Sequence, residues 1–256
     1  RKAGIQLGLL YYNDNQPEKA LAAYKQVISN YPGSEEAKIA LQDLKSVYID
    51  LNDINAYASY VNSIGGNIRL EVGEQDSLTY IAAEKLFMRG DNDGARRSLI
   101  NYLQTFPEGA FSSNANFYLG SIAFAKKEFD EAIQRFKSVI ASGDTKFLEE
   151  SVARTAEIEY LSKDYPAALE SFKRLQIVAE NPENRQAARL GIMRCALQTG
   201  QQKDALLAAD ELLKEPKLSP ELEAEARYVR AKAYIAQKQA NKALADLKEL
   251  SKDTRT

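Results

Sequence analysis

The chain contains no histidine among its 256 residues. This absence excludes imidazole acid–base catalysis, histidine-anchored triads and histidine metal ligands. It also contains only one cysteine, so it forms no intrachain disulfide. Because Cys195 lies in the apolar run Leu190–Leu197, we expect its side chain to be a small buried group rather than a reactive thiol.

The sequence also lacks an excess of charge of one sign and lacks long apolar runs. It has 34 basic and 36 acidic side chains, which gives a net charge of −2, so it has no general attraction to nucleic acid or to anionic membranes. No apolar stretch approaches the roughly 20 residues that cross a bilayer. A composition of 45% hydrophobic and 27% charged residues predicts a folded, water-soluble chain.

Sequence motifs of enzymes are absent as well. There is no phosphate-binding loop, no dinucleotide-binding glycine pattern and no nucleophile elbow. The acidic turn Gly90–Gly94 lacks the spaced ligands and the closing glutamate of a calcium loop. We therefore predict a protein that is not an enzyme and that binds neither a cofactor nor a metal.

The stretch Ala110–Val139 shows the pattern that is present instead. Its first half has apolar residues at helical spacing, and its second half has an i, i+3, i+4, i+7 apolar stripe. The turn between the halves ends at Asp130, a candidate helix N-cap. Helices this short are marginal in isolation, so each must bury its stripe against a partner.

This helix pair recurs along the whole chain. The landmark is an alanine early in each second helix, followed four residues later by an apolar residue in every copy. The landmarks, spaced by 36 to 39 residues, are Ala20, Ala56, Ala95, Ala132, Ala168, Ala205 and Ala243. Mostly small residues stand twelve positions earlier, where two helices can cross closely. The pattern predicts seven helix pairs, the second of which reads as one residue short between its helices.

One interruption of the array is predicted at residues 65–75. It begins with glycines, and residues 68–73 alternate apolar and charged side chains as an extended segment does. It is either a local kink or a hinge. The expected division is 1–64 with two pairs, 65–75 as the break, and 76–256 with five pairs. The chain starts at Arg1 and ends without a capping pattern, so we expect a fragment truncated at both ends of a longer array.

The repeat resembles the tetratricopeptide repeat family. In the first pair Gly8, Tyr11, Ala20, Tyr24 and Pro32 fall at the family spacing, and the resemblance covers essentially the whole chain. It implies an all-α fold, a right-handed superhelical α-solenoid of about seven helix pairs. It also implies a concave groove lined by the first helix of each pair, which such solenoids use for binding.

Three columns of residues lie on one face of the first helices, fifteen, eleven and eight positions before the landmark. Aromatic rings beside charges suit an extended peptide or a partner helix, although the uniformly large column at eight also suits a packed floor. The family's clamp for a terminal carboxylate uses lysine, arginine and asparagine here, whereas this chain has glutamate and serine. The candidate groove residues are Tyr80, Glu84, Phe87, Phe117, Ser121, Phe124, Glu157, Tyr160, Arg194, Tyr228 and Lys232.

A narrower resemblance concerns the junctions between pairs. Residues 31–37 and 106–120 resemble junctions of bacterial envelope tetratricopeptide proteins, those of the Tol–Pal system and of outer-membrane β-barrel assembly. The resemblance implies an adaptor protein in the periplasm, either free or associated with the outer membrane. We therefore expect a non-catalytic scaffold that binds a protein or peptide in a bacterial envelope complex. The alternative is a cytoplasmic peptide-sensing regulator, and the sequence names neither the partner nor the oligomeric state.

Overall fold

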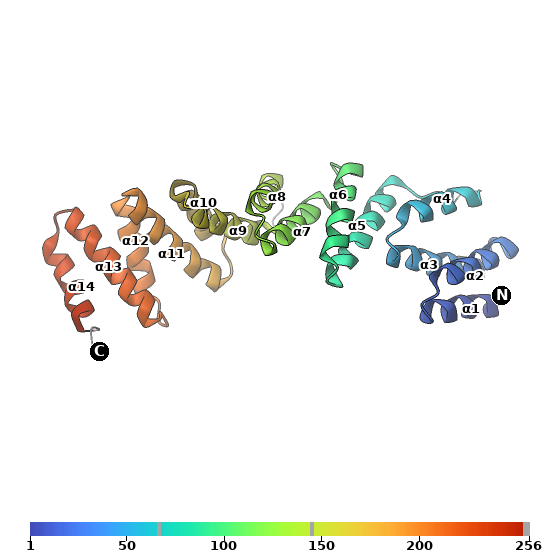
Figure 1. Cartoon of the computed structure of the whole chain (residues 1–256), viewed down its shortest axis with the longest axis horizontal. Helices are drawn as coiled ribbons and strands as arrows, with labels where there is room; N and C mark the ends of the chain where they lie inside the picture. Colours follow the sequence, from blue (N-terminus) through green and yellow to red (C-terminus); the bar gives the residue numbers. More distant parts are fainter. Residues whose placement is uncertain (66–67, 144–145, 253–256) are drawn as a thin grey trace. The chain divides into compact units, whose positions relative to one another are not determined.

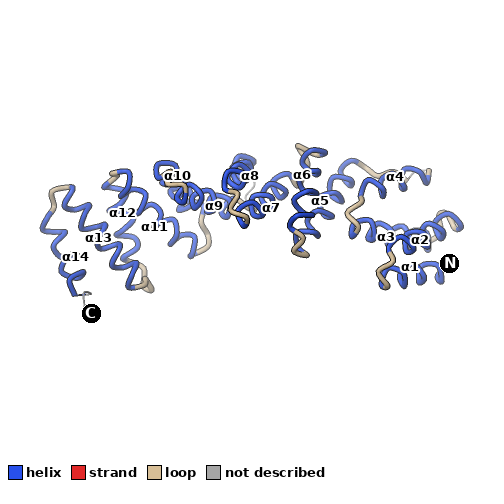
Figure 2. Tube along the Cα trace, in the orientation of Figure 1, coloured by secondary structure: helices blue, strands red, loops and turns tan. Residues whose placement is uncertain are grey.

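The computed structural model describes residues 1–65, 68–143 and 146–252. All regular structure in these residues is helical, and none of them forms a strand (Figure 2). The helices are α1 (Lys2–Asn13), α2 (Pro17–Asn30), α3 (Glu35–Asp50), α4 (Ile54–Ile64), α5 (Val72–Met88), α6 (Asn92–Thr105), α7 (Ser112–Ala125), α8 (Phe129–Ser142), α9 (Leu148–Leu161), α10 (Tyr165–Val178), α11 (Pro182–Thr199), α12 (Gln202–Leu213), α13 (Pro220–Ala236) and α14 (Ala240–Lys252) (Figure 1). The expected all-α array of seven helix pairs is confirmed, while the handedness of its superhelix stays a prediction.

A left-handed backbone residue stands in the turn inside every pair. It lies one position before the N-cap of the second helix, and a turn this short brings the two helices back against each other. The seven residues, with φ between 54° and 82°, are Asn15, Asn52, Gly90, Lys127, Lys163, Gly200 and Lys238. Glycine takes this conformation freely, whereas other residues pay about 1 kcal/mol or more for it.

The landmark alanines are buried four positions after that N-cap, with one exception. In the second pair Asp53 is the N-cap, and its side chain accepts a hydrogen bond from the backbone N–H of Ala56 at 3.2 Å. The buried residue at the landmark position is therefore Tyr57, only 4% exposed, and not Ala56. The predicted register was wrong by one residue, which is a rotation of about 100° around the helix. The turn of this pair is as long as the others.

Two further helix ends show how the chain is capped. Gly200 ends α11 in the left-handed conformation. Asp130 is not an N-cap, because α8 already begins at Phe129 and Glu128 takes the cap position. Asp130 lies instead in the first turn, where a carboxylate favours the helix dipole.

The chain forms two compact units, Arg1–Ile122 and Ala123–Thr256, with the boundary inside α7. Residues 66 and 67 of the predicted break lie outside the described residues. Helix α5 begins at Val72, so residues 72–75 are helical, and the extended segment predicted for 68–73 was wrong in its last two residues. A division of the array at 65–75 stays a prediction.

A carboxylate near the start of a first helix holds the next junction in place in both compact units. Asp76 accepts a hydrogen bond from the backbone N–H of Ala110 at 2.9 Å and another from the hydroxyl of Tyr102. Glu149, at the equivalent position nineteen before its landmark, accepts from the backbone N–H groups of Glu180 and Asn181 at 3.0 and 3.1 Å. These bonds fix where the following first helix starts.

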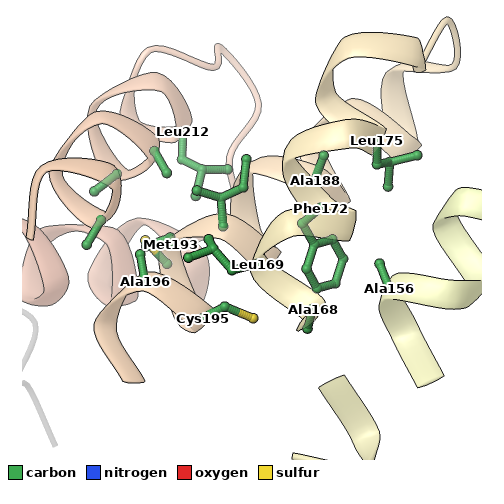
Figure 3. Packing of buried hydrophobic residues seen from close by; sticks show 14 of the residues in the cluster. Ala156, Ala168, Leu169, Phe172, Leu175, Ala188, Met193, Cys195, Ala196 and Leu212 are labelled. Carbon is green, nitrogen blue, oxygen red and sulfur yellow. The ribbon is translucent and has the colours of Figure 1, made fainter. Parts of the chain in front are cut away.

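The core of the second unit is built from small and medium side chains of α9 to α13. Figure 3 shows Phe172 of α10 beside Ala156 of α9, with Met193 and Ala196 of α11 in the same cluster. Cys195 is fully buried in it, and burial raises the pKa of its thiol to about 11. The prediction of a buried cysteine is confirmed, and the raised pKa disfavours the reactive thiolate form. None of the described helices combines the length and the apolar character that a membrane span requires.

Candidate functional site

A cleft of about 410 Å³ opens between α9, α10 and α11 in the second compact unit. Two of its three walls are first helices, the elements expected to line a binding groove. The main apolar lining residues are Ala153, Tyr160, Phe172, Leu175, Ala187 and Leu190. A volume of this size is typical of sites that hold a small ligand or a few side chains of a peptide.

Small side chains keep this cleft open. Ala153 stands fifteen positions before its landmark, where the neighbouring pairs carry Phe117 and Leu190. Gly191 acts differently, because a Cβ there would lie 2.4 Å from the ring of Phe172. The absence of a side chain at Gly191 thus allows Phe172 to pack against the backbone of α11. The small side chain of Ala153 leaves open space in the cleft beside α9.

The rim of the cleft is charged. Arg154 donates from Nε to Glu150 at 2.9 Å and from Nη1 to Glu157 at 3.0 Å. Arg194 donates two hydrogen bonds to the carboxylate of Glu225 on α13, at 2.7 and 2.9 Å. The hydrogen bonds to Glu225 raise the pKa of Arg194 above its ordinary value despite partial burial. Both guanidinium groups are therefore held in fixed orientations.

Three of the predicted groove residues, Glu157, Tyr160 and Arg194, line this one cleft. The ring of Tyr160 meets that of Phe172 edge to face at 6.5 Å, so one edge of the floor is fixed by aromatic packing. Phe124 belongs to the same compact unit and lies under the guanidinium of Arg154, whose central carbon is 4.7 Å from the ring centroid.

Tyr228 and Lys232 are not among the residues that line the cleft. They lie on α13, where the Lys232 ammonium is 5.4 Å from the centroid of the half-exposed Tyr228 ring. This pair forms a cation–π contact on the surface.

Tyr80 is a correction to the predicted groove. Its side chain is only 2% exposed, and its ring stacks on Phe111 with centroids 4.5 Å apart. Its hydroxyl donates to Glu84 and accepts from the Asn114 amide at 3.3 Å. Burial, followed by the hydrogen bond to Glu84, raises the pKa of Tyr80 far above its ordinary value. Tyr80 therefore belongs to the core, and Glu84 satisfies its buried hydroxyl.

The remaining candidates of the first compact unit pack against their neighbours. Phe87 and Phe117 each pack against the Tyr118 ring, with centroid distances of 4.6 and 5.7 Å. The hydroxyl of Ser121 donates to the backbone carbonyl of Phe117 at 2.9 Å. Phe87, which is half-buried, belongs to the column at eight, for which a packed floor was the alternative interpretation, and its contact with Tyr118 favours that alternative.

Sequence reasoning missed Arg154, Ala187 and Gly191 of the cleft. A signal for the place was present, because Ala153 is the one small residue in a column of larger side chains. Within the described ranges no group of three or more acidic or cysteine side chains is placed to hold a metal ion.

Comparisons with known proteins support the resemblance to the tetratricopeptide repeat family. Family models described as tetratricopeptide repeat match residues 3–34 and 82–145. No curated protein sequence matches the chain.

Two of the matching solved structures illustrate the likeness of the fold. YrrB, described as a tetratricopeptide protein with an unusual peptide-binding site, has a TM-score of 0.52 and 18% identity over 69% of this chain and 87% of its own. The C-terminal part of a tetratricopeptide repeat-containing protein from Cytophaga hutchinsonii has a TM-score of 0.51 and 15% identity over 98% of this chain and 96% of its own. At these identities the likeness shows the fold alone, a solenoid of tetratricopeptide-like helix pairs.

Proposed function

We propose that this solenoid is a non-catalytic scaffold that binds a segment of another protein, and that the cleft between α9, α10 and α11 is the binding site. The observation that carries the proposal is the cleft itself, with an apolar floor and an oriented charged rim on the first-helix face. Stacked helix pairs use this face to hold extended partners. Partner binding through grooves of preformed shape loses little entropy in the scaffold.

Two observations support this assignment. Glu157, Tyr160 and Arg194 are distant in sequence from one another by up to a full repeat, yet they line one cleft. The fold is shared with YrrB, which is described as having a peptide-binding site. The second point is an analogy between folds, and fold by itself does not fix function.

The test is selection from a random library of short peptides on the folded chain, followed by affinity measurement on an Ala153→Phe variant. A phenyl ring is tolerated at this repeat position, since Phe117 occupies it in the preceding pair. Filling the cleft should weaken the selected peptides by about tenfold or more. Ala141→Phe, on the exposed side of α8, is the matched control and should leave their affinity unchanged.

Circular dichroism checks that the variant is folded, and Ala187→Phe replaces Ala153→Phe if helical content is lost. Equal affinity for the parent chain and a folded, cleft-filled variant contradicts the assignment of the site. The same result follows if the library yields no peptide that prefers the parent chain.

For the setting of this function we propose a bacterial envelope complex in the periplasm. The proposal rests on the junction sequences at 31–37 and 106–120. Fractionation of cells that express the full-length protein tests it, and recovery in the cytoplasm instead would favour a peptide-sensing regulator.

A further inference from the structure

The charged groups in the cleft do not balance. Three carboxylates line it, those of Glu150, Glu157 and Glu183, together with the guanidinium groups of Arg154 and Arg194. Arg194 is already matched by Glu225, which approaches from α13 with both oxygens. Arg154 is shared between Glu150 and Glu157. The lining therefore carries more negative than positive charge.

Helix-dipole effects account for only part of this acidity. Glu150 and Glu183 lie in the first turns of α9 and α11, where a carboxylate is favoured in any case. Glu157 lies three turns into α9 and has no such reason to be acidic. Glu183 makes no ion pair within the described part of the chain, so its charge is available to a ligand.

The acidic groups stand beside an apolar floor with room for a side chain. Ala153, Ala187 and Leu190 line the open space, and the partly exposed ring of Tyr160 borders it. An aromatic face attracts a cation, and the stems of lysine and arginine are themselves apolar. A ligand that places a large apolar side chain over Ala153 and a cation near Glu157 would use both features at once.

We propose that the cleft selects a basic–apolar segment, in which a lysine or arginine is adjacent to a side chain of leucine or phenylalanine size. This inference rests on the proposed function and specifies the partner of the same site. The carboxylates attract the cation and disfavour an acidic segment, while the open floor requires the apolar neighbour. Arg154 bridges Glu150 and Glu157 at the rim.

The probe is again the random peptide library, now scored for composition. Peptides that bind the parent chain but not Ala153→Phe should be enriched in lysine or arginine next to a large apolar residue. For a selected peptide, Glu157→Gln and Glu183→Gln should each weaken binding several-fold, and the double variant by about tenfold or more. Glu170→Gln, which removes an exposed carboxylate of α10 outside the cleft, is the control and should change nothing.

Salt provides a second readout, because attraction between exposed charges is screened on the scale of about 10 Å at ordinary ionic strength. Affinity for the parent chain should fall as salt rises, and the double variant should lose this dependence. Cleft-dependent peptides that are neutral or acidic would overturn the basic preference while leaving the site assignment intact. Peptides insensitive to Ala153→Phe would overturn both.

Discussion

One repeat position holds a buried aromatic side chain in the first compact unit and a small side chain that lines a cleft in the second. Fifteen residues before the landmark, the first unit has Tyr80, which is 2% exposed and stacked on Phe111, and the second has Ala153, which lines a cleft of about 410 Å³. The backbone around both residues is a first helix of the same kind. A repeat fold thus sets where a groove could form, and side-chain size decides whether it is filled or open.

The largest effect on stability should come from removing the buried ring of Tyr80. Tyr80→Ala removes a buried ring and leaves Glu84 and Asn114 without their common partner, so the free energy of unfolding should fall by about 3–5 kcal/mol. Chemical denaturation measures this change. Tyr228→Ala, at the equivalent but half-exposed position on α13, is the control and should cost under about 1 kcal/mol. Similar losses for both would contradict the conclusion that this repeat position is filled and buried at Tyr80 but open to solvent at Tyr228.

A smaller effect is expected at the junction carboxylate of the second unit. Burial raises the pKa of Glu149. The hydrogen bonds from Asn184 and from the backbone of Glu180 and Asn181 together lower it by more than burial raises it, so the pKa lies below its ordinary value. The contribution to stability is therefore present above the unfolded-state pKa and lost as pH falls through the folded-state value.

Glu149→Gln should cost about 1 kcal/mol near neutral pH. The difference between parent and variant should shrink as the pH falls from the ordinary pKa of a glutamate, about 4.3, through the lower folded-state pKa, because the parent carboxyl becomes protonated over that range. Denaturation at a series of pH values measures it, with Glu170→Gln as the exposed control. A difference that stays constant with pH would show that the hydrogen bonds do not act through the charged carboxylate.

The smallest effect should come from the turns. Gly90 takes the left-handed conformation in the first unit, whereas Lys163 takes it in the second, with φ of 62°. Lys163→Gly should raise the free energy of unfolding by about 0.5–1 kcal/mol, because relief of strain exceeds the added freedom of the unfolded chain. Gly90→Ala should lower it by a similar amount. Thermal unfolding compares them, and a destabilising Lys163→Gly would contradict the account of the turn.

Most of the fold could be predicted from the sequence, because a repeated stripe reports the buried face of each helix. The clearest exception was the second pair, where the alanine at position 56 led to a register that differs by one residue from the buried Tyr57. Asp53 decides that register, since its side chain caps the helix and fixes its first turn. A shift of the N-cap by one residue is a weak sequence signal, yet it rotates the entire buried face of the helix.

The site was predictable only in part. Glu157, Tyr160 and Arg194 were identified by column, but the columns alone grouped them with Tyr80, which is buried. The position of a residue on the groove face of its helix does not reveal whether a ring from a neighbouring segment already covers it. Phe111, which closes over Tyr80, comes from a junction and belongs to no column.

By itself, the sequence determined seven helix pairs, a buried cysteine and a shared face of the first helices, because these follow from local periodicity and composition. Only the tertiary structure decided that this face is filled at Tyr80 and open at Ala153. It also decided that Arg194 forms an ion pair with Glu225, and that Arg154 forms ion pairs with both Glu150 and Glu157. Open volume and charge balance depend on the sizes and partners of side chains from several helices at once, and no single stretch of sequence records them.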